Sequence, residues 1–233
     1  MSNPNMALPF IPPLVDGERL TRDEFESRYD ATPDLKRAEL IEGIVHIAPP
    51  VRLMGHGIPC TVLISWLASY YAATPGTRAG VRAHIRFDSR NMLQPDVSFI
   101  ILPSYGGRAR ISADDYLEVG PELVACVWPR GVNFNFDAKF GVYQRNGVRE
   151  FVVWRTEQQQ IDWFVLRDGK YERLAPTPAG LLCSETFPGL WLDTAALLAD
   201  DFPAVLATLQ RGISDPAHAA FVAELQRRAG TAP

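Results

Sequence analysis

Three charged residues stand beside apolar segments, where their side chains could do chemistry. Asp96 follows Pro95 and precedes an apolar run that predicts a buried strand, Glu39 precedes another apolar segment, and Lys139 lies within a helical pattern. Carboxylates at the mouth of a sheet can hold a divalent cation, and a lysine beside them can orient a nucleophile. Two simpler roles stay open, namely a turn cap for Asp96 and a lysine stem that lies over an apolar stripe for Lys139.

The spacing of these residues has a second interpretation as a nuclease string. Pro95-Asp96 followed by Asp137-Ala138-Lys139 matches the pattern PD…DxK. This string is short and degenerate, so it gives weak evidence on its own.

The elements that must position these residues follow from hydrophobic periodicity. Strands are predicted at 38–47 (two, about a turn at Glu42-Gly43), 81–87, 96–102, 123–128, 150–155, 161–166 and 170–174. Helices are predicted from Thr21, which can form a capping box with Glu24, and at 57–73, 135–146, 194–211 and 216–228. The order predicts one α/β (α+β) domain, a mixed β-sheet flanked by helices. We expect residues 1–20 to form an N-terminal arm, 21–200 the main domain and 201–233 a C-terminal helical tail.

Composition narrows the class of protein. The chain has 233 residues, 47% of them hydrophobic, and a net charge of −4, which excludes a mostly disordered protein and argues against non-specific nucleic-acid binding. Its three cysteines are widely spaced and it has no CxxC or HxxxH pair, so neither a disulfide framework nor a structural zinc site is expected. No secretory signal or membrane-spanning stretch is evident, and the expected location is the cytoplasm.

Several longer motifs carry a resemblance to a known family. They are Glu39-Leu40-Ile41-Glu42-Gly43, Gln94-Pro95-Asp96, Pro121-Glu122-Leu123-Val124, Tyr143-Gln144-Arg145-Asn146-Gly147-Val148-Arg149-Glu150-Phe151, Ile161-Asp162-Trp163-Phe164 and Phe187-Pro188-Gly189-Leu190. From about Thr21 to Leu198 the chain resembles the Uma-two family of restriction endonucleases, in the PD-(D/E)xK nuclease superfamily. The resemblance implies a restriction-endonuclease-like core.

The resemblance also implies a chemistry and partners. It implies a hydrolase, an Mg²⁺-dependent endonuclease that cleaves the phosphodiester bonds of DNA. Carried over by position, Asp96 binds the metal, Glu39 supports the metal site and Lys139 helps to orient the nucleophile. Relatives with this fold often pair, which makes a homodimer the expectation by analogy.

One departure from the family pattern bears on activity. The strand that normally ends Val-Val-Glu-Val reads Val124-Ala125-Cys126-Val127 here, so a thiol stands where the second metal carboxylate belongs. Because Mg²⁺ prefers oxygen ligands, the favoured interpretation is a degenerate site, that is, a pseudoenzyme. The protein would then be a non-catalytic interaction module. In the alternative, Asp137 supplies the lost carboxylate and the protein remains a nuclease.

The remaining candidates are weaker. Cys126 could be a nucleophile activated by Lys139, but no histidine is placed by sequence to act as its base, so inert packing is favoured. His56 precedes the long helix, where it could approach the mouth of the sheet, although a role as a helix cap or a solvated side chain is favoured. His46 and His84 are expected at the surface. A basic rim that could attract DNA would be formed by Arg78, Arg82 and Arg86, or by Arg108 and Arg110.

Overall fold

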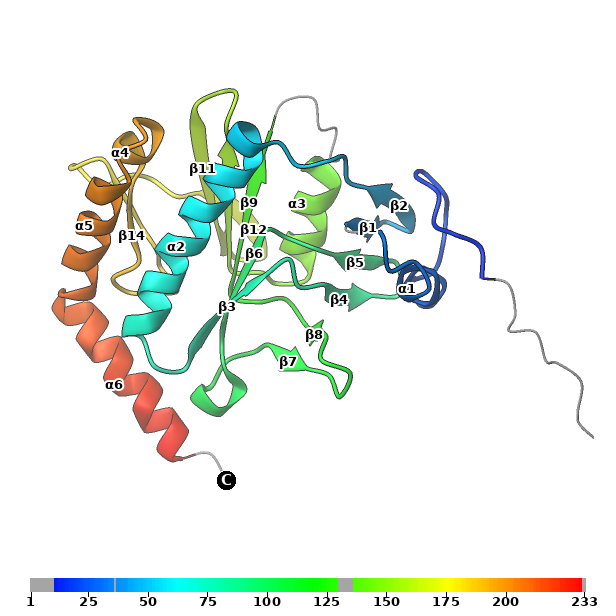
Figure 1. Ribbon diagram of the computed structural model, residues 1–233. Coiled ribbons are helices and arrows are strands. Elements are labelled where there is room, and N and C mark those ends of the chain that lie inside the picture. Colours follow the sequence, from blue (N-terminus) through cyan, green and yellow to red (C-terminus); the bar gives the residue numbers. More distant parts are fainter. Residues whose placement is uncertain (1–10, 36, 130–135, 232–233) are drawn as a thin grey trace, which may run out of the picture.

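Two six-stranded sheets, with helices packed on them, organise the computed structural model (Figure 1), which describes residues 11–35, 37–129 and 136–231. The helices are α1 (Arg22–Asp30), α2 (Ile58–Ala73), α3 (Phe136–Arg145), α4 (Thr194–Leu198), α5 (Phe202–Ile213) and α6 (Pro216–Gly230), with a π-helical turn at Leu53–Gly57 and a 3₁₀ turn at Pro103–Tyr105. The strands are β1 (Ala38–Ile41), β2 (Ile44–Ile47), β3 (Thr77–Val81), β4 (Ile85–Asp88), β5 (Asn91–Leu93), β6 (Val97–Ile101), β7 (Arg110–Ile111), β8 (Leu117–Glu118), β9 (Leu123–Trp128), β10 (Glu150–Arg155), β11 (Gln160–Arg167), β12 (Lys170–Arg173), β13 (Leu181–Cys183) and β14 (Trp191–Asp193).

The central sheet has the strand order β12-β11-β10-β9-β6-β3. Strands β9 and β10 run parallel, and α3 lies between them in the chain, whereas the other neighbours are antiparallel. The five residues Leu123–Val127 of β9 are all buried, as expected for a strand that is covered on both faces. This sheet therefore confirms the predicted mixed α+β class.

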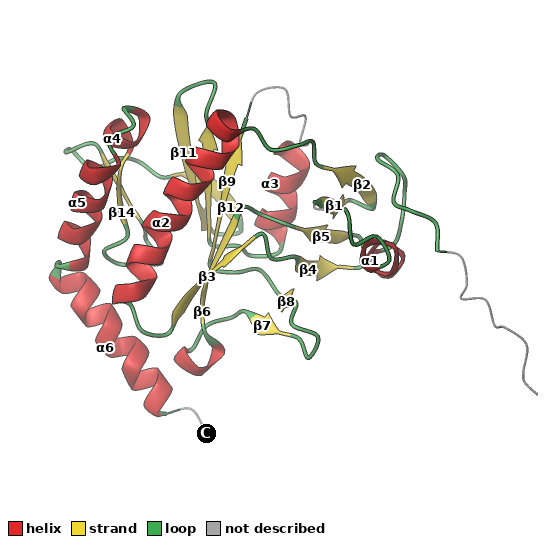
Figure 2. Cartoon of the chain, viewed as in Figure 1, coloured by secondary structure: helices red, strands yellow, loops and turns green. Residues whose placement is uncertain are grey.

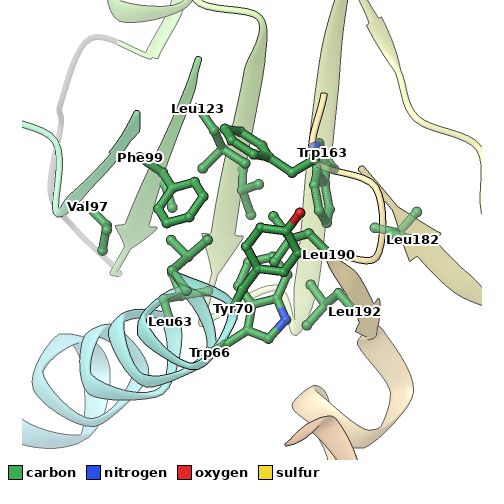
Figure 3. Packing of buried hydrophobic residues seen from close by; sticks show 14 of the residues in the cluster. Leu63, Trp66, Tyr70, Val97, Phe99, Leu123, Trp163, Leu182, Leu190 and Leu192 are labelled. Carbon is green, nitrogen blue, oxygen red and sulfur yellow. The ribbon is translucent and has the colours of Figure 1, made fainter. Parts of the chain in front are cut away.

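One face of the central sheet carries the largest apolar core. Helix α2 packs Leu63, Trp66 and Tyr70 against Phe99 of β6 and Trp163 of β11 (Figure 3). Helices α5 and α6 lie beyond α2 (Figure 2) and add side chains to the same core, namely Val205, Leu209 and Leu225. The C-terminal helices are thus packed on the main core.

The second sheet, with the order β2-β1-β5-β4-β8-β7, lies across the other side of α3 (Figure 1). Val142 and Tyr143 of α3 share a core with Ile41 of β1 and with Phe151 of β10. Helix α3 is therefore enclosed between the two sheets, and any polar side chain on its buried face must find its partner there.

Most predicted elements are confirmed, and two boundaries are wrong for a local backbone reason. The predicted strand 81–87 begins too early, because Val81 is the last residue of β3, Arg82 takes a left-handed conformation (φ 52°) and β4 starts only at Ile85. The predicted helix 194–211 is broken at Asp200 (φ 59°), after which Asp201 caps α5. The predicted hairpin at Asp168-Gly169 is confirmed, and both residues have the positive φ that such a two-residue turn requires.

Candidate functional site

Strand β1 and helix α3 bring Glu39 and Lys139 together between the sheets. Residues of β1 alternate between two cores, so Glu39 shares the face of Ile41 that points toward α3. Lys139 shares the buried face of α3 with Val142 and Tyr143. The Nζ atom of Lys139 lies 2.8 Å from Oε1 and 2.6 Å from Oε2 of Glu39.

This pair is closed to solvent. Glu39 and Lys139 are each 1% exposed, and the backbone N–H of Gln94 donates a second hydrogen bond to Oε1 of Glu39 at 2.8 Å. The Glu39 carboxylate is thus held by one ammonium group and one backbone amide.

Asp96 lies directly before β6 and is fully buried. Its Oδ2 accepts a hydrogen bond from the backbone N–H of Val127 at 2.8 Å, and its Oδ1 lies 3.1 Å from Nη1 of Arg37 and 3.0 Å from Nε2 of His56. Burial by itself would raise the pKa of the Asp96 carboxyl. The hydrogen bond with His56 and the charge of Arg37 outweigh burial, so the pKa lies below its ordinary value.

Of the two basic residues beside Asp96, Arg37 was not singled out from the sequence, and the sequence favoured another environment for His56. His56 was expected to cap the helix or to be solvated, but it is 4% exposed and contacts Asp96, because the π-helical turn before α2 directs its ring toward the sheet. Arg37 stands two residues before Glu39, a spacing that places both on one face of an extended segment. That spacing was the available signal for Arg37.

Cys126 stands opposite Asp96 in the central sheet. The antiparallel register pairs Val97 with Ala125, so the residues one step further along, Asp96 and Cys126, are neighbours. Burial raises the pKa of the Cys126 thiol to about 12, although the charge of Lys139 opposes it. The side chain is therefore a neutral thiol at neutral pH and a poor nucleophile.

Asp137, the other carboxylate considered for the site, lies apart from it. It is exposed in the first turn of α3, whereas Lys139, two residues later, is buried. Within the described ranges, no hydrogen bond or ion pair joins Asp137 to Asp96, Glu39 or Lys139. The structure brings together Glu39, Asp96, Lys139 and Cys126, and it leaves Asp137 outside.

Asp96 also belongs to a group of potential metal ligands. One ligand atom from each of His56, Cys60 and Asp96 lies within 4.8 Å of the others, and all three residues are buried. Burial raises the pKa of the Cys60 thiol to about 11.

The predicted basic rim is partly neutralised by internal contacts. Arg86 forms ion pairs with Glu26 at 2.8 Å and with Asp114 at 2.7 Å. Arg108 is exposed and donates to the carbonyl of Gly147.

His84, expected at the surface, is buried and contacts the carbonyl of Ala38.

Comparison with known proteins identifies the family. The model of the Uma2 family, described as a putative restriction endonuclease, matches residues 22–195. The chain belongs to the Uma2 family. The match covers the segments that carry Glu39, Asp96, Cys126 and Lys139, and it confirms the resemblance on which the nuclease prediction rests.

A solved structure supports the Uma2 fold. The chain is similar to a putative nuclease of DUF820 from Anabaena variabilis, with a TM-score of 0.53 and 14% sequence identity over 74% of this chain and 97% of that one. At this identity the likeness shows the fold alone. No curated protein matches the chain. The site roles of Glu39, Asp96 and Lys139, DNA as a substrate and a homodimer stay predictions.

None of the helices in the described part of the chain has the length and apolar character needed to cross a lipid bilayer.

Proposed function

We propose that this Uma2 protein keeps the nuclease fold but does not hydrolyse DNA with Mg²⁺, and that it acts as a non-catalytic module. The observation that carries the proposal is the pairing of the two buried carboxylates. Glu39 is paired with Lys139, and Asp96 is paired with Arg37 and His56. Each of these anionic groups already lies within ion-pair distance of a basic side chain of the protein itself.

The donor atoms around Asp96 do not fit Mg²⁺. This ion requires near-octahedral oxygen coordination and is usually held by one or two carboxylates together with water and phosphate oxygens. The position of the second carboxylate carries the thiol of Cys126, which burial keeps neutral. A neutral sulfur atom offers Mg²⁺ neither a preferred ligand nor a negative charge.

The balance of charge in the cluster points in the same direction. The carboxylates of Glu39 and Asp96 are matched by the cations of Lys139 and Arg37, all four of them at most 8% exposed. An Mg²⁺ ion held by these carboxylates would have to displace Arg37, whose Nη1 is 3.1 Å from Oδ1 of Asp96. With one carboxylate missing, the site lacks the negative charge that would drive this exchange.

A plasmid cleavage assay tests the proposal. Supercoiled DNA is incubated with Mg²⁺ or Mn²⁺ and with wild type, Asp96→Ala or Cys126→Glu, and circular dichroism confirms that each variant is folded. We expect the wild type and Asp96→Ala to be equally inactive, because neither presents two carboxylates. Cleavage by Cys126→Glu alone would add support. Cleavage by the wild type that is lost in Asp96→Ala would refute the proposal.

A further inference from the structure

We infer that His56, Cys60 and Asp96 form a binding site for a transition-metal ion of borderline softness, of which Zn²⁺ is the representative. The three side chains offer nitrogen, sulfur and oxygen, and their ligand atoms lie within 4.8 Å of one another. This inference concerns metal binding alone and does not rest on whether the protein cleaves DNA.

The local fold places two of the three ligands on the same face of one helical segment. The π-helical turn Leu53–Gly57 runs directly into α2, so His56 and Cys60 are four residues apart on a continuous helical segment. Side chains at this spacing lie one above the other on the same helix face. Asp96 approaches that face from the start of β6, and its Oδ1 is 3.0 Å from Nε2 of His56. The ligands therefore come from one helical segment and from the residue directly before β6.

The distances suit tetrahedral zinc. Nitrogen and oxygen ligands about 2.0 Å from zinc are about 3.3 Å apart at the tetrahedral angle, and a sulfur ligand at about 2.3 Å is about 3.6 Å from either. The His56–Asp96 separation of 3.0 Å is close to the first value. The Cys60 sulfur lies within 4.8 Å of one ligand nitrogen of His56 and one carboxylate oxygen of Asp96, so a movement of about 1 Å would bring it to bonding geometry.

A positively charged group already stands beside these ligands. Nη1 of Arg37 is 3.1 Å from Oδ1 of Asp96 and 3.4 Å from Nε2 of His56. The guanidinium thus marks a position that attracts positive charge, and it competes with a metal ion for that position. Nδ1 of His56 is buried, with no hydrogen-bond partner among the described residues. It can carry the ring proton when Nε2 binds a metal.

Ligand chemistry selects the class of metal. Imidazole nitrogen and thiolate sulfur bind Zn²⁺ and its neighbours far better than Mg²⁺, which prefers oxygen. On binding, the Cys60 thiol loses its proton to the solvent, and the new thiolate adds a negative charge beside Asp96. That added charge offsets the repulsion from Arg37. The site contains neither a CxxC nor an HxxxH motif, so those motifs do not indicate it; its ligands are one HxxxC pair and a distant aspartate.

The test uses the full chain, stripped of metal with a chelator and titrated with Co²⁺ as a spectroscopic substitute for Zn²⁺. We expect one Co²⁺ per chain, a thiolate-to-cobalt charge-transfer band, displacement by Zn²⁺ and no displacement by excess Mg²⁺. Cys60→Ser should remove the band and lower affinity by about 100-fold or more, since even loss of a ligand's hydrogen-bond partner costs 10–100-fold. The matched control Cys183→Ser, at a cysteine in β13 away from the site, should keep both.

Arg37→Met provides a second, independent readout. Removing the competing guanidinium should raise the affinity for Co²⁺, whereas a structural role for Arg37 alone would leave it unchanged or lower. Circular dichroism and the melting temperature with and without Zn²⁺ show whether each variant is folded. Absence of stoichiometric Co²⁺ binding by the folded wild type, or a thiolate band that survives in Cys60→Ser, would overturn the inference.

Discussion

Removal of Lys139 should reveal how strongly the cluster depends on its buried ion pair. Lys139→Met keeps most of the volume of the side chain and removes its charge. The Glu39 carboxylate, 1% exposed, would then keep the backbone N–H of Gln94 as its hydrogen-bond donor. Breaking a buried pair by removal of one partner costs about 3–5 kcal/mol, since the other charge is left without compensation.

Glu39→Gln, the change on the other side of the pair, should lower stability about as much as Lys139→Met, and the double variant should lose less than either. Glu39→Gln leaves the Lys139 ammonium buried without its carboxylate, so a loss of about 3–5 kcal/mol is again expected. In the double variant neither charge remains, and the glutamine carbonyl can still accept from Gln94. Its total cost should fall to about 1–3 kcal/mol, the price of an imperfectly satisfied buried amide.

Urea unfolding of the wild type, both single variants and the double variant forms a cycle that measures this coupling. The exposed Arg227–Glu224 pair supplies the control, because Arg227→Met should barely move the unfolding midpoint. If the losses of the two single variants simply add in the double variant, Glu39 and Lys139 are not the coupled, water-excluded pair described above.

Three further predictions concern other parts of the molecule. Because the pKa of Asp96 is lowered in the folded protein, its contribution to stability is fully present above the unfolded pKa of 3.8 and is lost as pH falls through the folded pKa. The difference in stability between wild type and Asp96→Asn should therefore shrink in acid. Urea midpoints of the two proteins that keep a constant difference down to about pH 2 would contradict this. Alkylation mapped by mass spectrometry should modify the half-buried Cys183 of the native protein before Cys60 and Cys126, whose buried thiols have pKa values raised to about 11 and about 12; rapid modification of Cys126 would revive a thiol enzyme. In thermal unfolding, Gly189→Ala should lower stability more than Gly180→Ala. Both residues have positive φ, which costs an alanine about 1–3 kcal/mol, but only at Gly189 would the new Cβ meet the backbone oxygen of Gly212, at 2.6 Å. Equal losses of stability would show that the contact with α5 can relax.

The fold was largely predictable from sequence, because its signals are local. The buried run of β9 and the Asp168-Gly169 turn depend on neighbouring residues, and both were predicted where the structure has them. The boundaries at Arg82 and Asp200 failed because non-glycine residues adopt positive φ there, which a pattern of apolar residues does not register.

The candidate site was predictable only in part. Glu39, Asp96 and Lys139 were found through motifs, but the basic residues that contact Asp96 come from elsewhere in the chain. His56 is 40 residues from Asp96 and reaches it through a π-helical turn, an irregular element without a hydrophobic period. Nothing in the sequence around Arg37 indicates that this arginine is buried, whereas in the fold it is only 8% exposed. The spacing of Arg37 and Glu39 indicates a shared face, but the pairing of Arg37 with Asp96 depends on how the sheets pack.

Titration calorimetry with Mg²⁺ tests the central claim most directly, because it measures the metal site without reference to a substrate. The wild type should give no heat of binding at millimolar Mg²⁺ beyond that of dilution, since Asp96 and Glu39 are paired with Arg37 and Lys139 and the second ligand position carries the neutral thiol of Cys126. Stoichiometric Mg²⁺ binding by the wild type that disappears in Asp96→Asn would contradict the account.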